Sequence, residues 1–346
     1  MPTQNQSYEN TQSPYFGAAK HPLSAEGVFL PEGYESEVES YFEIRRKEYA
    51  QGVIITKRIK MSDGSEYEVD TGLPTEPTTN IPITTTTPWL TGKNGLNKRR
   101  MLALMKAGFP VDFVGSEIKF GSHANLAKSS HNQLKITELT AEEESLDKDL
   151  LIVEGISRAA MIGFGLNAMS KDHDKTIIYS DLIAPCFPKR LDLRHSADYL
   201  KIPLSEPAIV RHLGRLPLHH LLRYPSTFST HPSDLIRHMQ AVPTLTSGIA
   251  GDFAKHMPED ARGSVVAFKG DILSQGEEWE RILAEYPNMH FLDEPGAAHL
   301  DCAAPETYDA WLARQQALTS ELERTKNNPD KVKWERIQLG KVAVKS

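Results

Sequence analysis

The stretch DLLIVEGISRAAMIGFGLNAMSK, residues 149–171, decides the fold. Its nearly continuous apolar start predicts a buried strand over 149–155, and the small and apolar residues that follow predict a helix over 157–171. Ser157 therefore lies on a sharp turn from strand to helix, with Gly155 two residues before it and Ala159 two residues after it. Small residues at these two positions allow the strand and the helix to approach closely, so that the serine hydroxyl is presented above the sheet edge.

Ser157 has two interpretations at this stage. A serine on such a turn, beside the free backbone N–H groups of a helix N-terminus, is a candidate nucleophile. Serine is also a preferred residue for capping a helix N-terminus through its side chain, which is a purely structural role. The sequence leaves both interpretations open.

Strands and helices alternate on both sides of this stretch, which predicts an α/β protein with a mostly parallel sheet covered by helices on both faces. The run 36–49 also predicts a helix. Asp63-Gly64, between two candidate strands, predicts a tight hairpin in which both central residues have positive φ. The candidate strands are 52–60, 65–72, 80–90, 110–115, 149–155, 175–185, 264–271 and 288–296, and the other main helices are 96–108, 275–286 and 304–324.

A base and a carboxylate follow Ser157 in the chain. Asp271 comes directly after the predicted strand SVVAFKG, and His299 lies in the small-residue loop PGAAH after the next strand. Because the carboxyl ends of parallel strands share one edge of a sheet, we expect these side chains to gather there. A serine needs a base, and the base needs an orienting carboxylate. Asp181, after the strand that begins at 175, is the alternative carboxylate.

These features, in the order Ser157, Asp271, His299, resemble the α/β-hydrolase fold family over roughly residues 50–324. The resemblance implies a mostly parallel eight-stranded sheet flanked by helices, with a helical cap insertion. It implies that Ser157 is the nucleophile, that His299 is the general base and then acid, and that Asp271 orients the histidine. It implies no cofactor.

The family also requires an oxyanion hole. One donor is expected to be the backbone N–H of Arg158, and the other to come from the loop Thr87–Gly92. The usual His-Gly of this loop is replaced by Thr-Pro, and proline carries no N–H. Trp89 is therefore the preferred second donor, and Leu90 is the alternative.

The length of 346 residues fits two domains or one large domain with insertions, and the order of the predicted strands, helices and motifs favours the second. We expect a loosely ordered N-terminal arm, a core in two segments, a helical cap between them and a charged C-terminal tail. The ranges are 1–35 for the arm, 36–185 and 263–324 for the core, 186–262 for the cap and 325–346 for the tail.

Composition narrows the class of protein. A net charge of −7 argues against a nucleic-acid binder. Two cysteines, Cys186 and Cys302, exclude a disulfide framework, and no spacing of histidines and cysteines predicts a metal site. No apolar run is long enough for a membrane span and no secretory signal is visible, so a cytoplasmic location is expected. The oligomeric state stays open, a homodimer included.

Taken together, these features predict a serine hydrolase that cleaves a small-molecule carboxylic ester through an acyl-enzyme intermediate. The same residues would serve a thioesterase, an amidase or peptidase, or an acyltransferase. An inactive hydrolase-fold protein that only binds ligands is the alternative from another class, and the altered oxyanion loop is consistent with it.

Overall fold

The fold comes from a computed structural model, which describes residues 30, 34–87, 95–115, 126–189, 248–268, 271, 273–294 and 305–338. The strands are β1 (Val38–Tyr49), β2 (Gly52–Met61), β3 (Glu66–Pro74), β4 (Ile83–Thr86), β5 (Val111–Val114), β6 (Leu150–Ile156), β7 (Thr176–Ile183), β8 (Gly263–Phe268) and β9 (Met289–Glu294). The helices are α1 (Gly95–Lys106), α2 (Leu126–Glu143), α3 (Arg158–Met169), η2 (Ser170–His173), α8 (Ile249–Ala254), α9 (Gly276–Leu283), α10 (Pro305–Thr325), η5 (Pro329–Lys331) and α11 (Trp334–Gln338).

The nine described strands form one sheet in the order β1-β2-β3-β5-β4-β6-β7-β8-β9. The pairs from β5 through to β9 are parallel, whereas β1, β2 and β3 join the sheet through antiparallel pairs. The prediction of a mostly parallel sheet is therefore confirmed. The expected number of eight strands is wrong, because β1 adds a ninth.

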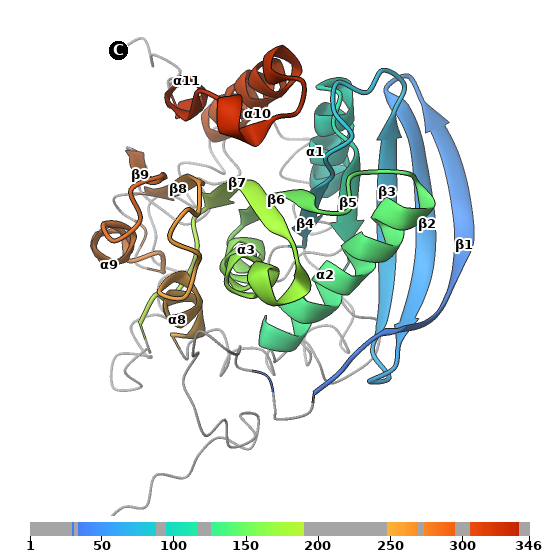
Figure 1. The fold of residues 1–346 in the computed structure, drawn as a ribbon, viewed down its shortest axis with the longest axis horizontal. Coiled ribbons are helices and arrows are strands. Elements are labelled where there is room, and N and C mark those ends of the chain that lie inside the picture. The colour runs from blue at the N-terminus through green and yellow to red at the C-terminus, as the bar shows by residue number, and fades with distance from the viewer. Residues whose placement is uncertain are drawn as a thin grey trace, which may run out of the picture.

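Helices cover both faces of the sheet (Figure 1). Helices α1, α10 and α11 pack on one face, where Ile152, Trp311 and Leu318 belong to one apolar cluster. Helices α2, α3, α8 and α9 lie on the other face, where the rings of Phe164 and Trp279 stack with their centroids 4.6 Å apart. The central strands are buried on both sides, which explains why their sequences are continuous apolar runs.

The run 36–49 is predicted to be a helix, but Val38–Tyr49 forms strand β1 instead. The strand pairs antiparallel with β2 from Val38, opposite Met61, to Tyr49, opposite Gly52. It is exposed along almost its whole length, so neither face shows the alternation of apolar and polar residues that identifies a half-buried strand. Pairing with β2 decides the structure here and overrides local helix propensity.

The hairpin predicted at Asp63-Gly64 is confirmed, because it connects β2 to β3. Its turn differs from the expectation: Gly64 has a φ of 82°, but Asp63 is not among the residues with positive φ. The Gly64 N–H donates to the Met61 carbonyl, and the Asp63 carboxylate accepts from the Ser65 N–H at 2.9 Å. An aspartate that bonds the backbone two residues later stabilises this wider turn without a positive φ of its own.

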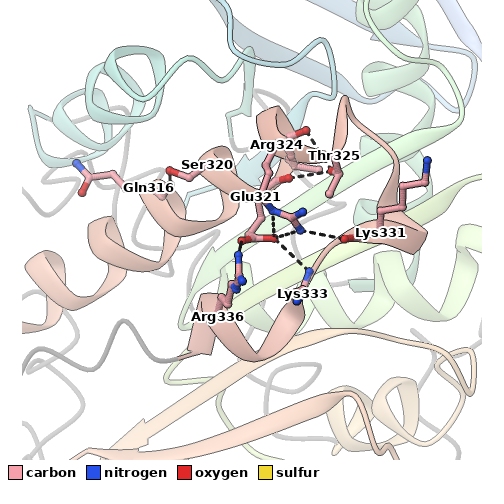
Figure 2. A network of polar contacts seen from close by, with 9 residues as sticks. Gln316, Ser320, Glu321, Arg324, Thr325, Lys331, Lys333 and Arg336 are labelled. Carbon is pink, nitrogen blue, oxygen red and sulfur yellow. Dashed lines mark hydrogen bonds and ion pairs between the residues drawn. The ribbon is translucent and has the colours of Figure 1, made fainter.

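One carboxylate, that of Glu321, bonds to groups on both of the described α-helices that follow the last strand. Glu321, on α10, accepts hydrogen bonds from the Arg324 and Arg336 guanidinium groups and from the Lys333 N–H, so that it joins α10 to α11 (Figure 2). Its side chain is only 7% exposed. The hydrogen bonds from Arg324 lower the pKa of Glu321 to about 2.

The lowered pKa of Glu321 predicts a pH-dependent stability. In the unfolded chain a glutamate titrates near 4.3, so the stabilisation is fully present above that pH and is lost as the pH falls towards 2. Because Arg324 and Arg336 are about half exposed, we expect at most about 1 kcal/mol. Denaturant unfolding of the wild type and of Glu321→Gln at pH 6 and pH 3 measures it. Equal pH dependence in the two proteins would contradict the assignment.

Most of the predicted cap, 186–262, lies outside the described residues, and its boundaries stay a prediction. Within the described part, Cys186 and Phe187 follow β7 and belong to the same apolar cluster as Ile249 and Phe253 of α8.

Candidate active site

The turn between β6 and α3 holds Ser157 in an unusual backbone conformation, with φ 58° and ψ −119°. Residues other than glycine rarely adopt positive φ, and such strain concentrates at functional sites. The Ser157 N–H donates to the Ile183 carbonyl oxygen at 2.8 Å, which fixes the turn against the end of β7. The sharp strand-to-helix turn predicted from the sequence is confirmed.

Gly155 makes this turn possible. A Cβ atom added at this position would lie 2.5 Å from the backbone carbonyl carbon and oxygen of Ala159, a distance that real Cβ atoms do not show. Residue 155 must therefore be glycine for β6 and α3 to approach as they do. This close approach is the reason for the small residues flanking Ser157.

Capping does not explain the serine. Ser157 occupies the residue before α3, but its side chain makes no capping hydrogen bond to the helix. Its hydroxyl oxygen instead lies 3.7 Å from the Sγ atom of Cys186, a residue that follows β7. The hydroxyl therefore points across the strand ends and not back towards the helix backbone.

Asp271 lies at the same edge of the sheet. Ile156, the residue before Ser157, is in register with Ile183 of β7, which is in register with Val266 of β8. Asp271 follows the end of β8 by three residues. Strand pairing thus brings the chain segments that carry the predicted nucleophile and the predicted carboxylate to neighbouring carboxyl ends.

The Asp271 carboxylate is fixed by its own loop. One of its oxygens accepts hydrogen bonds from the N–H groups of Leu273, at 2.9 Å, and Ser274, at 3.2 Å. The residue is 4% exposed. Backbone donors that hold a buried carboxylate in one orientation suit a group whose task is to orient another side chain.

Asp181, the alternative carboxylate, lies within β7 and is fully buried. Its two oxygens accept from the Arg314 guanidinium, at 3.1 Å for each of two nitrogens, and from the side chains of Gln315 and Ser264, both at 3.0 Å. Arg314 and Gln315 belong to α10. Asp181 is therefore engaged with the helix that covers one face of the sheet.

A second buried ion pair lies under the turn. Glu154, three residues before Ser157, pairs with Arg100 of α1, and both side chains are at least 96% buried. Burial raises the pKa of Glu154, whereas the charge of Arg100 opposes this rise. The guanidinium also lies 5.7 Å from the ring centroid of Trp311. The pair joins β6 to the helix that follows the predicted oxyanion loop.

Sequence reasoning did not find Arg100, Arg314 or the contact of Cys186 with Ser157. The available signal was a carboxylate inside an apolar strand, since a buried carboxylate requires a cationic partner. That signal shows that partners exist, but it does not identify the arginines that supply them.

Of the predicted site residues, the structure describes Ser157, Arg158 and Asp271. Arg158 is the first residue of α3 and is buried. His299, Trp89 and Leu90 lie outside the described residues, so their predicted roles remain predictions.

Seven histidines lie in the predicted cap, where their spacing predicts no metal site. His256 is described, and its Nδ1 lies 2.8 Å from the carbonyl oxygen of Asp252, a residue of α8. The other six lie outside the described residues, as does Cys302; the six are His195, His212, His219, His220, His231 and His238. In the part of the chain that is described, no three histidine, cysteine, aspartate or glutamate side chains converge as a metal site would require. No described helix is long and apolar enough to cross a membrane.

Comparisons with known proteins show similarity at the level of structure alone. No protein-family model matches the chain, and no curated protein matches its sequence. Three solved structures each superpose with a TM-score of 0.51. A carboxylesterase of the ammonia-oxidizing thaumarchaeon Nitrososphaera gargenis is 12% identical and covers 75% of this chain and 97% of its own. A bacterial brefeldin A esterase, described as a homologue of human hormone sensitive lipase, is 14% identical and covers 81% and 79%. A serine hydrolase involved in carbazole degradation is 12% identical and covers 77% and 99%.

Proposed function

The chain has the α/β-hydrolase fold, and from this premise we propose that it is a serine hydrolase that cleaves small-molecule carboxylic esters. The observation that carries the proposal is the strained turn at Ser157, whose side chain does not cap the following helix. A fold keeps a serine at φ 58° only where the surrounding structure enforces it, and such strain is typical of residues that do chemistry.

In the proposed mechanism, the Ser157 hydroxyl oxygen attacks the carbonyl carbon of the ester, and His299 accepts its proton. The backbone N–H of Arg158, together with that of Trp89 or Leu90, stabilises the negative oxygen of the tetrahedral intermediate. The ester bond then breaks, and the alcohol leaves with the proton from His299. Water, deprotonated by His299, releases the acid from Ser157. No step requires a cofactor.

Asp271 is proposed to orient His299 and to stabilise its protonated form. Two features support Asp271 over Asp181. Asp271 comes after the strand end, at the edge where Ser157 lies, whereas Asp181 lies inside β7 and both its oxygens accept from side chains of α10 or β8. An aspartate that orients the catalytic histidine must have an oxygen directed to it.

Labelling with a fluorophosphonate probe tests the proposal. An activated serine attacks the probe phosphorus, so we expect stoichiometric labelling of the full-length protein, located on Ser157 by peptide mass spectrometry. The same protein should then be tested on matched ester, thioester and amide substrates. Labelling with fastest turnover of the ester supports the proposal. A preference for the thioester or amide would move the protein to one of the alternative hydrolase classes.

Absence of labelling at Ser157 would favour a protein that has the fold but only binds ligands. The reference for this outcome is an unrelated active serine hydrolase labelled in the same reaction. The folded state of the unlabelled protein must be verified by circular dichroism.

A further inference from the structure

Strand β1 is the edge strand of the described sheet. It is the first strand in the sheet order and, among the described strands, it pairs with β2 alone. Its 12 residues extend over about 40 Å, and it lies at the outer end of the sheet, far from α8 and α9 (Figure 1). One side of its backbone thus has N–H and C=O groups directed away from the sheet, which is a template for another strand.

The exposed apolar residues gather on this strand. In the described part of the chain, the exposed large hydrophobic side chains are Tyr41, Phe42 and Ile44, which are 44%, 53% and 41% exposed. All three lie within four residues at the centre of β1. Ile44 has no register partner on β2, because the pairing shifts by one residue between Glu43 and Arg45. Apolar and aromatic residues that gather in this way are typical of an interaction surface.

The charges on β1 indicate which partner fits. Charged residues protect many edge strands by repelling a second strand. On β1, however, the two signs are separated along the strand, with Glu48 near its end as the exception. The first half carries Glu39 and Glu43, and the second half carries Arg45, Arg46 and Lys47. Two antiparallel copies of β1 would therefore place acidic residues opposite basic ones, whereas two parallel copies would place like charges together.

We propose that two copies of this chain associate through β1, paired antiparallel about a two-fold axis that passes through Phe42. Opposed residues of an antiparallel pair point to the same face of the sheet, so the axis passes through a residue and not between two. In this register Glu39 of one copy lies opposite Arg45 of the other, and the two Phe42 residues lie opposite each other. The contact is self-complementary, so it closes as a dimer with one sheet continuous through both copies. The existing ion pair of Glu39 with Lys60 does not prevent this, since both side chains are about half exposed and such pairs contribute little.

Charge reversal tests the proposal. One variant, Glu39→Lys with Glu43→Lys, makes β1 basic, and the other, Arg45→Glu with Arg46→Glu, makes it acidic. Light scattering coupled to size exclusion, over a range of protein and salt concentrations, should show a dimer for the wild type and a monomer for each variant alone. An equimolar mixture of the two variants should restore the dimer. Added salt should weaken the wild-type dimer, because the pairs are solvent-exposed.

Two results would overturn the proposal: a wild type that stays monomeric up to its solubility limit, or variants that each dimerise as the wild type does. Circular dichroism shows whether the variants are folded.

Cross-linking gives a second readout that does not depend on the folding of the double variants. Glu43→Cys places two thiols next to the axis, where a short bismaleimide should join them. Glu48→Cys is the matched control, since its two thiols would be about 40 Å apart in this register. Equal cross-linking of the two variants would reject the register. Neither readout measures Ser157 chemistry, so the outcome is independent of the proposed hydrolase activity.

Discussion

Replacement of Ser157 by alanine is expected to lower kcat for a short p-nitrophenyl ester by about 10⁶-fold, with the fold unchanged. The hydroxyl is the group that forms the acyl-enzyme bond, and no described neighbour can replace it: the thiol of Cys186 is 3.7 Å from Ser157 Oγ, but it is not on the turn that presents the nucleophile. The loss should be mainly in kcat, because the alanine side chain leaves the binding surface largely intact. Initial rates with purified protein, together with circular dichroism spectra, measure it.

Two control variants make this result specific. Ser170→Ala removes another buried serine hydroxyl, at the far end of α3, which donates to the Asn167 carbonyl at 2.9 Å. This variant is expected to lose about 1 kcal/mol of unfolding free energy and to retain full kcat. Ser157→Gly is expected to be as inactive as Ser157→Ala but about 1 kcal/mol more stable than it, since glycine adopts a φ of 58° without strain.

Retained turnover in Ser157→Ala, after a control for contaminating esterase in a mock purification, would contradict the nucleophile assignment. Equal stability of the alanine and glycine variants would show that the turn is not strained as its backbone angles indicate. The two measurements are independent, so the nucleophile assignment and the backbone strain are tested separately.

The central strands were predictable because burial on both faces leaves a strong pattern in the sequence. The runs LLIVEGI of β6 and GSVVAF of β8 predict buried strands without any tertiary information. The turn at Ser157 was predictable for the same reason: Gly155 and Ala159 are small where the chain must approach itself, and the steric requirement is visible in the residue types.

What could not be predicted depends on partners that are distant in sequence. Strand β1 is exposed, so its residues carry no burial pattern, and its conformation comes from pairing with β2. The ion pair of Glu154 with Arg100 could not be predicted from local sequence either. Arg99 and Arg100 are adjacent, and only the placement of α1 on the sheet decides which of them is buried. Local sequence shows that a buried carboxylate needs a partner, but the packing of helices selects it.

Asparagine substitutions separate the two aspartates that compete for the role of orienting His299. Asp271→Asn is expected to lower kcat by about 10⁴-fold with little loss of stability, because an amide in place of the carboxylate holds the histidine in the wrong tautomer. Asp181→Asn is expected to do the reverse. It removes the charge of Asp181 from a buried ion pair with the Arg314 guanidinium, which costs about 3 kcal/mol or more of unfolding free energy, while kcat per folded molecule stays within a few-fold of the wild type.

Denaturant unfolding and ester kinetics on both variants measure this contrast, and titration with the fluorophosphonate probe gives the fraction of active molecules. Dividing the measured rate by this fraction matters most for Asp181→Asn, because its lower stability reduces total activity without any change in chemistry. If Asp181→Asn retains its folded fraction but loses kcat, and Asp271→Asn retains kcat, the carboxylate that orients His299 is Asp181. In that case its bonds to Arg314 and Gln315 must rearrange when substrate binds, since both oxygens now accept from side chains of α10.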